Sequence, residues 1–155
     1  MDAVEAEELA LRSRSIDQAG ELIEGWVHDH HANRIYAGWT WSREGTIYVG
    51  FTQEPDATVA RMKGELKFVA PDRVQPFPVA PVHSERELWS LSETVVEYLR
   101  SFPGSWTDAS IDVLANKVKI GSQKVALTRR LIVGHFGADA PIEVVKGYPA
   151  VALRS

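Results

Sequence analysis

The amino-acid sequence predicts an α+β protein made of two β-β-α-β units with small antiparallel sheets. A helix precedes the first unit, and a linking helix joins the two. Two stretches rich in β-branched or aromatic residues, at residues 35–52 and 110–121, are typical of β-hairpins. Each is followed by a helix pattern and a further extended segment, so the halves match in element order. We expect the first unit within residues 1–83 and the second within residues 84–155, with one compact domain as the alternative.

The composition excludes several classes of protein. Hydrophobic residues make up 45% of the 155 residues, as in a folded protein rather than a disordered one. The net charge of −4, with both signs interspersed, gives no basic face for nucleic acid. No apolar run approaches the roughly 18 residues of a membrane span, and the acidic N-terminus does not resemble a signal peptide. The absence of cysteine excludes disulfides and thiolate catalysis.

The N-terminal helix is predicted from apolar residues that recur at spacings of three and four, namely Ile16, Ala19, Ile23 and either Trp26 or Val27. Ser15 precedes this pattern, so we expect its side chain to cap the helix. Residues 2–14 are charged and alanine-rich, which indicates a helical or frayed lead-in.

The first hairpin is the most aromatic part of the chain. Its turn is expected at residues 42–45, because Gly45 tolerates the positive φ of a tight hairpin loop. Gly38 and Gly50 within the arms indicate a bulge or a close approach by another element. Apolar residues of both arms are expected in the core, including at least one of the two tryptophans. These residues are Trp39, Trp41, Ile47, Val49 and Phe51.

The hairpin is followed by a predicted short helix and an edge strand. Glu54, Pro55 and Asp56 are typical of a helix start, and the helix pattern continues to about Leu66. The third strand is expected at residues 77–82. Its prolines lack the N–H group of a ladder, which places the strand at an edge of the sheet.

The second half begins with a capping signal. Ser84 followed three residues later by Glu87 is a capping box, which predicts a helix from there. Its apolar pattern runs through Leu99 and Phe102, and Pro103 and Gly104 stop it. The second hairpin is expected to turn at residues 115–116.

The remaining elements are a helix, a strand and a tail. Ser122 is expected to cap the helix and Gly137 to end it. A strand is predicted at residues 141–146, and an extended tail follows it.

The histidines form one cluster that resembles a metal site. His28, His30 and His31, together with Asp29, offer imidazoles and a carboxylate to zinc or nickel. The commoner role of such residues is a solvated helix end, where polar or cationic side chains are favourable. We therefore expect neither a metal nor another cofactor, and we keep a histidine-based metal protein as an alternative.

No motif for catalysis is present. The sequence lacks Gly-x-Ser-x-Gly, His-Glu-x-x-His and a phosphate-binding loop, so we expect the chain not to be an enzyme. Asp108 and Asp112 are a carboxylate pair of the kind that is usually just solvated. Trp39, Trp41 and Trp106 offer the other alternative, a platform for a carbohydrate, a nucleobase or a partner protein.

Residues 37–39 (Ala-Gly-Trp) and 45–52 (Gly-Thr-Ile-Tyr-Val-Gly-Phe-Thr), preceded by the helix at residues 16–27, resemble the start of known protease pro-regions. These are the pro-regions of bacterial chymotrypsin-like serine proteases of the streptogrisin and α-lytic protease group. The capped helix after Ser84 and the hairpin around residues 111–120 are similar to later pro-region elements. The resemblance implies a non-catalytic, extracellular protein-binding module that assists the folding of a serine protease and then inhibits it.

The resemblance also implies where the partner binds. Pro-regions of this group leave their C-terminal tail in the substrate cleft of the protease, which here corresponds to Val151, Ala152, Leu153, Arg154 and Ser155. A frayed terminus is the alternative. The sequence departs from the family in that no protease with its Gly-Asp-Ser-Gly-Gly motif follows, and in the full helix of its second half. It is expected to be an isolated pro-domain, a piece of a longer protein or a relative that binds something else.

Overall fold

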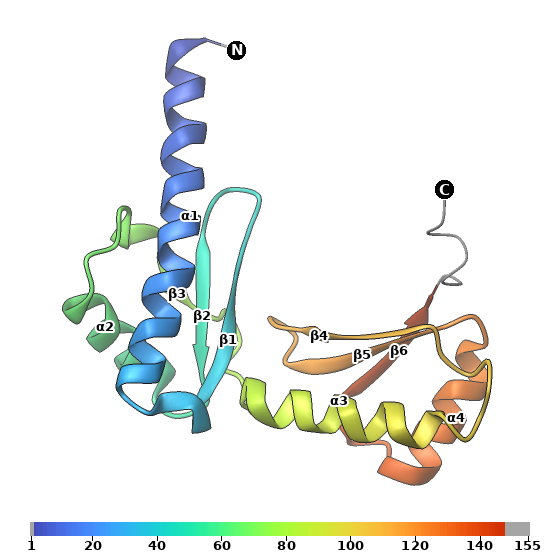
Figure 1. The fold of residues 1–155 in the computed structure, drawn as a ribbon. Helices are drawn as coiled ribbons and strands as arrows, with labels where there is room; N and C mark the ends of the chain where they lie inside the picture. Colours follow the sequence, from blue (N-terminus) through green and yellow to red (C-terminus); the bar gives the residue numbers. More distant parts are fainter. Residues whose placement is uncertain (1, 148–155) are drawn as a thin grey trace. The chain divides into compact units, whose positions relative to one another are not determined.

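The structure, a computed structural model, describes residues 2–147. It divides into two units, Met1–Arg86 and Glu87–Ser155, each with a helix leading into a β-β-α-β arrangement (Figure 1). The predicted α+β class is confirmed, since four α-helices accompany two small three-stranded sheets in the described residues. Among residues 2–147, no helix combines the length and hydropathy of a membrane span.

Helix α1 (Ala3–Asp29) is longer than the sequence pattern predicted. The prediction that Ser15 caps it is wrong, because Ser15 lies inside the helix and its hydroxyl donates to the Arg12 carbonyl at 2.8 Å. The cap is a box formed by Asp2 and Glu5, in which each side chain accepts a hydrogen bond from the other's backbone N–H. This cap and the helix-favouring Ala, Glu and Leu residues behind it start the helix a dozen residues before its apolar face begins.

The first sheet contains three strands in the order β1-β2-β3. Strands β1 (Tyr36–Trp41) and β2 (Ile47–Phe51) are antiparallel, whereas β3 (Val74–Pro76) lies parallel to β2. The sheet is therefore mixed, which corrects the prediction of an antiparallel sheet. The cause is helix α2 (Pro55–Glu65), whose crossover from β2 to β3 returns the chain in the same direction.

The first hairpin has the predicted turn, and its glycines serve the predicted purposes. Gly45 has a φ of 87°, and a bulge lies at Gly38. A Cβ atom on Gly50 would lie 2.5 Å from the Phe77 ring, so this ring packs directly on the strand backbone. The prediction of a strand at residues 77–82 is therefore wrong, because β3 ends at Pro76 and Phe77 packs on β2 from outside the ladder.

The core of the first unit lies between one face of its sheet and the helices α1 and α2, which both cover that face (Figure 1). Ile47, Val49 and Phe51 are fully buried there, as predicted. The expectation that Trp39 or Trp41 is buried is wrong: Trp39 is half-buried and Trp41 is 55% exposed. Both lie on β1, an edge strand of the sheet.

The second unit repeats this topology. Helix α3 (Glu85–Leu99) leads into the hairpin of β4 (Asp108–Asp112) and β5 (Lys117–Ser122), and helix α4 (Val125–Phe136) leads into β6 (Ile142–Lys146). Strands β4 and β5 are antiparallel and β5 and β6 are parallel, so this sheet is mixed as well. The predicted architectural repeat is confirmed, and α3 and α4 again cover one face of the sheet (Figure 1).

Local signals in the second unit are partly confirmed. Asn116 takes a left-handed φ of 58° in the turn, and Gly137 is the C-cap of α4. Helix α3 begins directly after Ser84, which is buried. Ser122 is not the N-cap of α4, because Lys124 holds that position; the Ser122 hydroxyl instead accepts from the Lys124 N–H at 2.9 Å.

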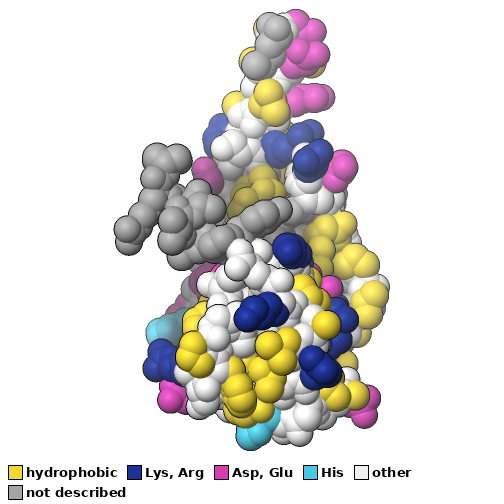
Figure 2. Space-filling view, turned by 90° about the vertical axis from the view of Figure 1, so that its right-hand side faces the viewer, with side chains coloured by type: hydrophobic (Ala, Val, Ile, Leu, Met, Phe, Trp, Pro, Cys, Tyr) yellow, Lys and Arg dark blue, Asp and Glu magenta, His cyan; other side chains and the backbone are white. Residues whose placement is uncertain are grey.

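The charged residues are dispersed over the surface. On the face shown in Figure 2, described Lys and Arg side chains are scattered among hydrophobic and uncharged ones and form no continuous basic patch. The two signs alternate in the same way along the sequence.

Candidate binding sites

The predicted contact residues Val151, Ala152, Leu153, Arg154 and Ser155 lie outside the described residues. The structure does describe the point at which the chain leaves the second sheet. Strand β6 is an edge strand, and the Gly147 N–H continues its ladder by donating to the Ser122 carbonyl at 2.9 Å. A Cβ atom on Gly147 would lie 2.1 Å from the Thr107 hydroxyl, so this tight exit from the sheet requires glycine.

A buried network of hydroxyl groups supports the same end of the sheet. The Ser122 and Thr128 hydroxyls are 2.8 Å apart, and the Thr128 hydroxyl donates to the Ser105 carbonyl. All three residues are buried. The network joins the end of β5, the first turn of α4 and the loop before β4. It therefore fixes the end of β5, the strand that pairs with the end of β6.

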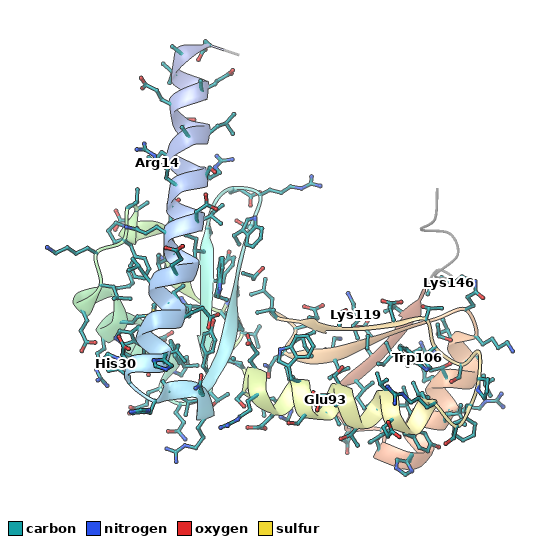
Figure 3. The ribbon with its side chains drawn as sticks, viewed as in Figure 1. Arg14, His30, Glu93, Trp106, Lys119 and Lys146 are labelled. Carbon is teal, nitrogen blue, oxygen red and sulfur yellow. The ribbon has the colours of Figure 1, made fainter. Side chains whose placement is uncertain are left out.

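The face of the second sheet that α3 and α4 do not cover is polar. Lys117 on β5 pairs with Glu143 on β6 at 2.7 Å, and Lys119 pairs with Asp112 on β4 at 3.5 Å. Figure 3 shows Lys119 on the side of the sheet away from α3. Asp108 and Asp112 do not form a carboxylate pair, because they lie at opposite ends of β4, and Asp108 accepts from the Thr107 hydroxyl.

In the first unit, a groove lies between α1 and the edge strand β1. It has a volume of about 590 Å³ and contains the side chains of Trp39 and Trp41, whose ring centroids are 5.6 Å apart. A Cβ atom on Gly20 would lie 2.5 Å from the Trp39 ring, so this glycine lets the ring rest on the helix backbone. Trp106, the third tryptophan of the predicted platform, packs against the core of the second unit instead.

Carboxylates cluster near one end of this groove. The buried Tyr36 hydroxyl donates to Glu24 at 2.9 Å. Burial raises the pKa of Tyr36 well above its ordinary value, and the negative charges of Glu24 and Glu85 raise it further. Burial also raises the pKa of Glu85, with a smaller contribution from Glu24. Negative charge is therefore concentrated where α1 passes Tyr36.

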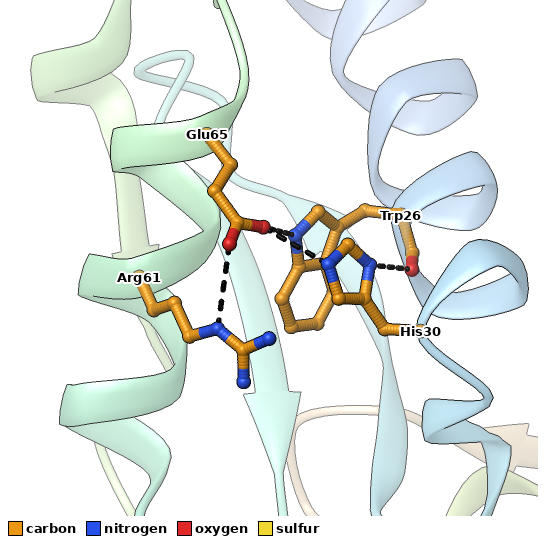
Figure 4. Close-up of polar contacts among 4 residues, drawn as sticks. All are labelled: Trp26, His30, Arg61 and Glu65. Atoms are coloured by element: carbon orange, nitrogen blue, oxygen red, sulfur yellow. Dashed lines mark hydrogen bonds and ion pairs between the residues drawn. The ribbon is translucent and has the colours of Figure 1, made fainter.

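A second polar cluster joins α1 to α2 (Figure 4). The Glu65 carboxylate accepts a hydrogen bond from the Trp26 indole N–H, and its oxygens lie 3.1 Å from His30 Nε2 and 3.4 Å from Arg61 Nε. The His30 ring stacks on Trp26 at 4.2 Å. The hydrogen bond from the Trp26 indole N–H lowers the pKa of Glu65 most, and the nearby His30 and Arg61 lower it further. Partial desolvation raises this pKa but does not outweigh them. The cluster therefore fixes two helices against each other.

The three histidines of the predicted metal cluster have different environments. His28 is exposed and lies 3.5 Å from Asp29, His30 takes part in the cluster around Glu65, and His31 has a left-handed φ of 51°. Within residues 2–147, no group of three or more His, Asp or Glu side chains is placed to hold a metal ion.

Sequence reasoning missed Glu24 and Glu65. Both are single carboxylates on helix surfaces, and their partners Tyr36 and Trp26 are 12 and 39 residues away in the chain. A buried tyrosine or tryptophan requires a partner for its O–H or N–H group, and this rule is the signal that points to such carboxylates. Comparisons with protein-family models, curated proteins and solved structures found no match to this chain.

Proposed function

We propose that this chain is a non-catalytic protein-binding module of the protease pro-region type, and that its second unit binds a chymotrypsin-like serine protease. The observation that carries the proposal is the position of β6, an edge strand that directly precedes the C-terminal segment. The sequence resemblance supports it from the first hairpin, which forms at the residues that carry the resemblance.

The edge position supplies a physical means of binding. An edge strand leaves one row of backbone N–H and C=O groups unpaired, and these groups can pair with a strand of another protein. The C-terminal segment that follows β6 is then delivered to the same partner, with alternate side chains entering its pockets. Gly147 and the hydroxyl network of Ser122 and Thr128 hold this exit point in place.

The polar face of the second sheet supports a specific interaction rather than a purely apolar one. Its alternating cations and carboxylates, with Lys117, Lys119, Asp112 and Glu143 in pairs, offer charge complementarity to a partner surface. Such complementarity mainly improves specificity and the rate of association. In the pro-region setting, the same contacts would template the folding of a secreted bacterial protease and then inhibit it.

The test uses a streptogrisin-type protease and two forms of the protein. The full chain should inhibit the protease, and a chain without residues 151–155 should inhibit it at least about tenfold more weakly, which corresponds to about 1.4 kcal/mol. The variant Trp89→Ala, at an exposed position of α3, controls for unspecific effects and should not change inhibition. Equal inhibition by the shortened chain would show that the tail is not the contact. No inhibition by the full chain would overturn the proposal.

The non-catalytic part has its own test. The purified chain should not hydrolyse peptide, ester or phosphate substrates. Hydrolysis that disappears when His30 or His135 is replaced would contradict this part of the proposal.

A further inference from the structure

The groove between α1 and β1 is lined by two tryptophans, one half-buried and one exposed, and by carboxylates as its only charged residues within the described part of the chain. Trp39 and Trp41 line it together with Ile16 and with three carboxylates of α1, which we call the acidic rim: Asp17, Glu21 and Glu24. All three carboxylates are exposed. The lining contains no Lys, Arg or His side chain among the described residues, so the charge of the groove is of one sign.

This combination fits a ligand with an apolar body and a positive charge. A cation over a tryptophan ring is attracted by the negative face of its π system. Carboxylates beside the ring add charge-assisted hydrogen bonds, which arginine can make in pairs. The neighbouring carboxylates of Glu24 and Glu85 repel each other, and a cation at this end of the groove would reduce that repulsion.

The second unit shows that the fold does not require these tryptophans. Trp39 lies opposite Val49 and Trp41 opposite Ile47 in the first hairpin. The corresponding positions of the second hairpin, opposite Ile120 and Val118, are held by Ala109 and Ile111. These smaller residues are packed against the second core and support the same sheet topology. Trp41 therefore leaves about half of its surface exposed without a structural need for so large a side chain.

We propose that this groove binds an extended basic segment of a protein partner, with an arginine or lysine side chain over the Trp39–Trp41 pair and further cations along the acidic rim. The length of the rim favours a peptide over a small cation. Asp17, Glu21 and Glu24 lie on one face of α1 over about two turns, or roughly 10 Å. Basic residues at alternate positions of an extended chain are about 7 Å apart, so two of them fit within that length.

This site is independent of the proposed protease contact. It lies in the first unit, whereas the tail and β6 belong to the second. Its failure would leave the tail proposal standing, and the reverse also holds.

The experiment titrates the full chain with a fluorescent peptide that alternates arginine and alanine. Binding is measured by anisotropy and by tryptophan emission. A peptide with citrulline in place of arginine keeps the shape and part of the N–H donors but removes the charge and turns one donor nitrogen into a carbonyl oxygen, and it should bind at least about tenfold more weakly. Added salt should weaken binding of the arginine peptide, because the rim carboxylates are exposed and easily screened.

Matched variants locate the site. Trp41→Ile introduces the residue of the second hairpin, and Glu21→Gln removes one rim charge; each should weaken binding about tenfold. The controls Trp89→Ala and Glu93→Gln change an exposed tryptophan and an exposed glutamate on α3 and should leave binding within about twofold. Trp41→Tyr keeps an aromatic face and should retain most of the affinity. Circular dichroism checks that every variant is folded.

Four results would overturn the inference. They are equal binding of the arginine and citrulline peptides, equal losses in the α3 controls, binding of tetramethylammonium as tight as that of the peptide, and binding of an oligosaccharide in place of the peptide.

Discussion

The two units share one topology and build it from different side chains. The core of the first unit contains aromatic residues, including Trp26, Tyr36 and Phe51. The buried core cluster of the second is aliphatic, with Leu99, Ile120 and similar residues. The end of the central strand shows the contrast best. Phe51 ends β2 in the first unit, four residues after the partner of Trp41, and Ser122 ends β5 in the second, four residues after the partner of Ile111.

This difference shows which features determine the fold and which determine the surface. The order of elements and the alternation of buried residues along β2 and β5 are common to both units, so they suffice for the topology. The choice of aromatic or aliphatic residues then decides what lies at the surface. Trp39 packs against the first core as Ala109 and Ile111 pack against the second, but the large rings of Trp39 and Trp41 also line a groove with α1.

The largest predicted effect concerns Phe51, which is fully buried under α1 and α2. Phe51→Ala should lower the free energy of unfolding of the first unit by about 3–5 kcal/mol, because it removes the transfer energy of the ring and leaves a cavity. Chemical denaturation followed by tryptophan emission measures the loss. Val4→Ala, at an exposed position of α1, is the control and should change stability by less than about 0.5 kcal/mol. A loss below about 1 kcal/mol for Phe51→Ala would show that the aromatic core is not what stabilises this unit.

The corresponding position of the second unit is stabilised by hydrogen bonds instead of apolar packing. Ser122→Ala removes the hydroxyl that contacts the buried Thr128 hydroxyl and accepts from the Lys124 N–H, and it leaves that N–H without this acceptor. We expect a loss of about 1–3 kcal/mol in the free energy of unfolding. Ser90→Ala, on the exposed face of α3, is the matched control. If Ser122→Ala left the free energy of unfolding unchanged, the hydrogen bonds of Ser122 would not stabilise the end of β5 as the apolar packing of Phe51 stabilises the end of β2.

The residues directly before the first helix of each unit differ in their burial. Asp2 caps α1 at an exposed position, whereas Ser84, directly before α3, is buried. Ser84→Ala should cost about 1 kcal/mol, the ordinary cost of losing an N-cap. Thermal unfolding of Ser84→Ala and of Asp2→Ala compares the N-terminal ends of α3 and α1. A loss of stability smaller than about 1 kcal/mol for Ser84→Ala would contradict its predicted role as an N-cap.

The smallest predicted effect is a pH dependence of the first unit. Since the pKa of Glu65 is lowered in the folded state, its contribution to stability is complete above the ordinary value of 4.5 and is lost as the pH falls toward the lower folded pKa. Glu65→Gln should therefore flatten the acid side of the stability curve. Glu97→Gln, in an exposed pair with Arg100 on α3, is the control. Identical acid profiles for the wild type and Glu65→Gln would contradict the role of the Trp26 contact.

The sequence predicted elements well where the signal is local. The hairpin turn at Gly45, the start of α2 at Pro55 and the end of α4 at Gly137 depend on the φ of one residue or on a missing N–H group. It failed where a distant partner decides. Ser15 has the chemistry of an N-cap, but the helix already starts at the Asp2 cap. Phe77 was predicted in a strand, but its ring packs against Gly50 instead.

The same reasoning applies to the candidate sites. The exposed position of Trp41 follows from which strand is at the edge and how far α1 extends across it, and neither can be derived from local pattern. The link from Trp26 to Glu65 spans 39 residues and requires the packing of α1 on α2. The repeat, by contrast, was visible because it depends on element order alone.

Helix α1 has a consequence for hydrogen exchange. Its 27 residues extend beyond its sheet (Figure 1), and the side chains of its first dozen residues are exposed or nearly so, whereas its buried residues begin at Ser15. The outer turns therefore gain helicity by extending a helix already nucleated against the core. They are held by their own hydrogen bonds, by the Asp2 box and by one hydrogen bond from Arg12 to the Arg43 carbonyl. Amide protection should rise steadily along this single helix, from rapid exchange near Val4 to exchange by global unfolding near Ile23.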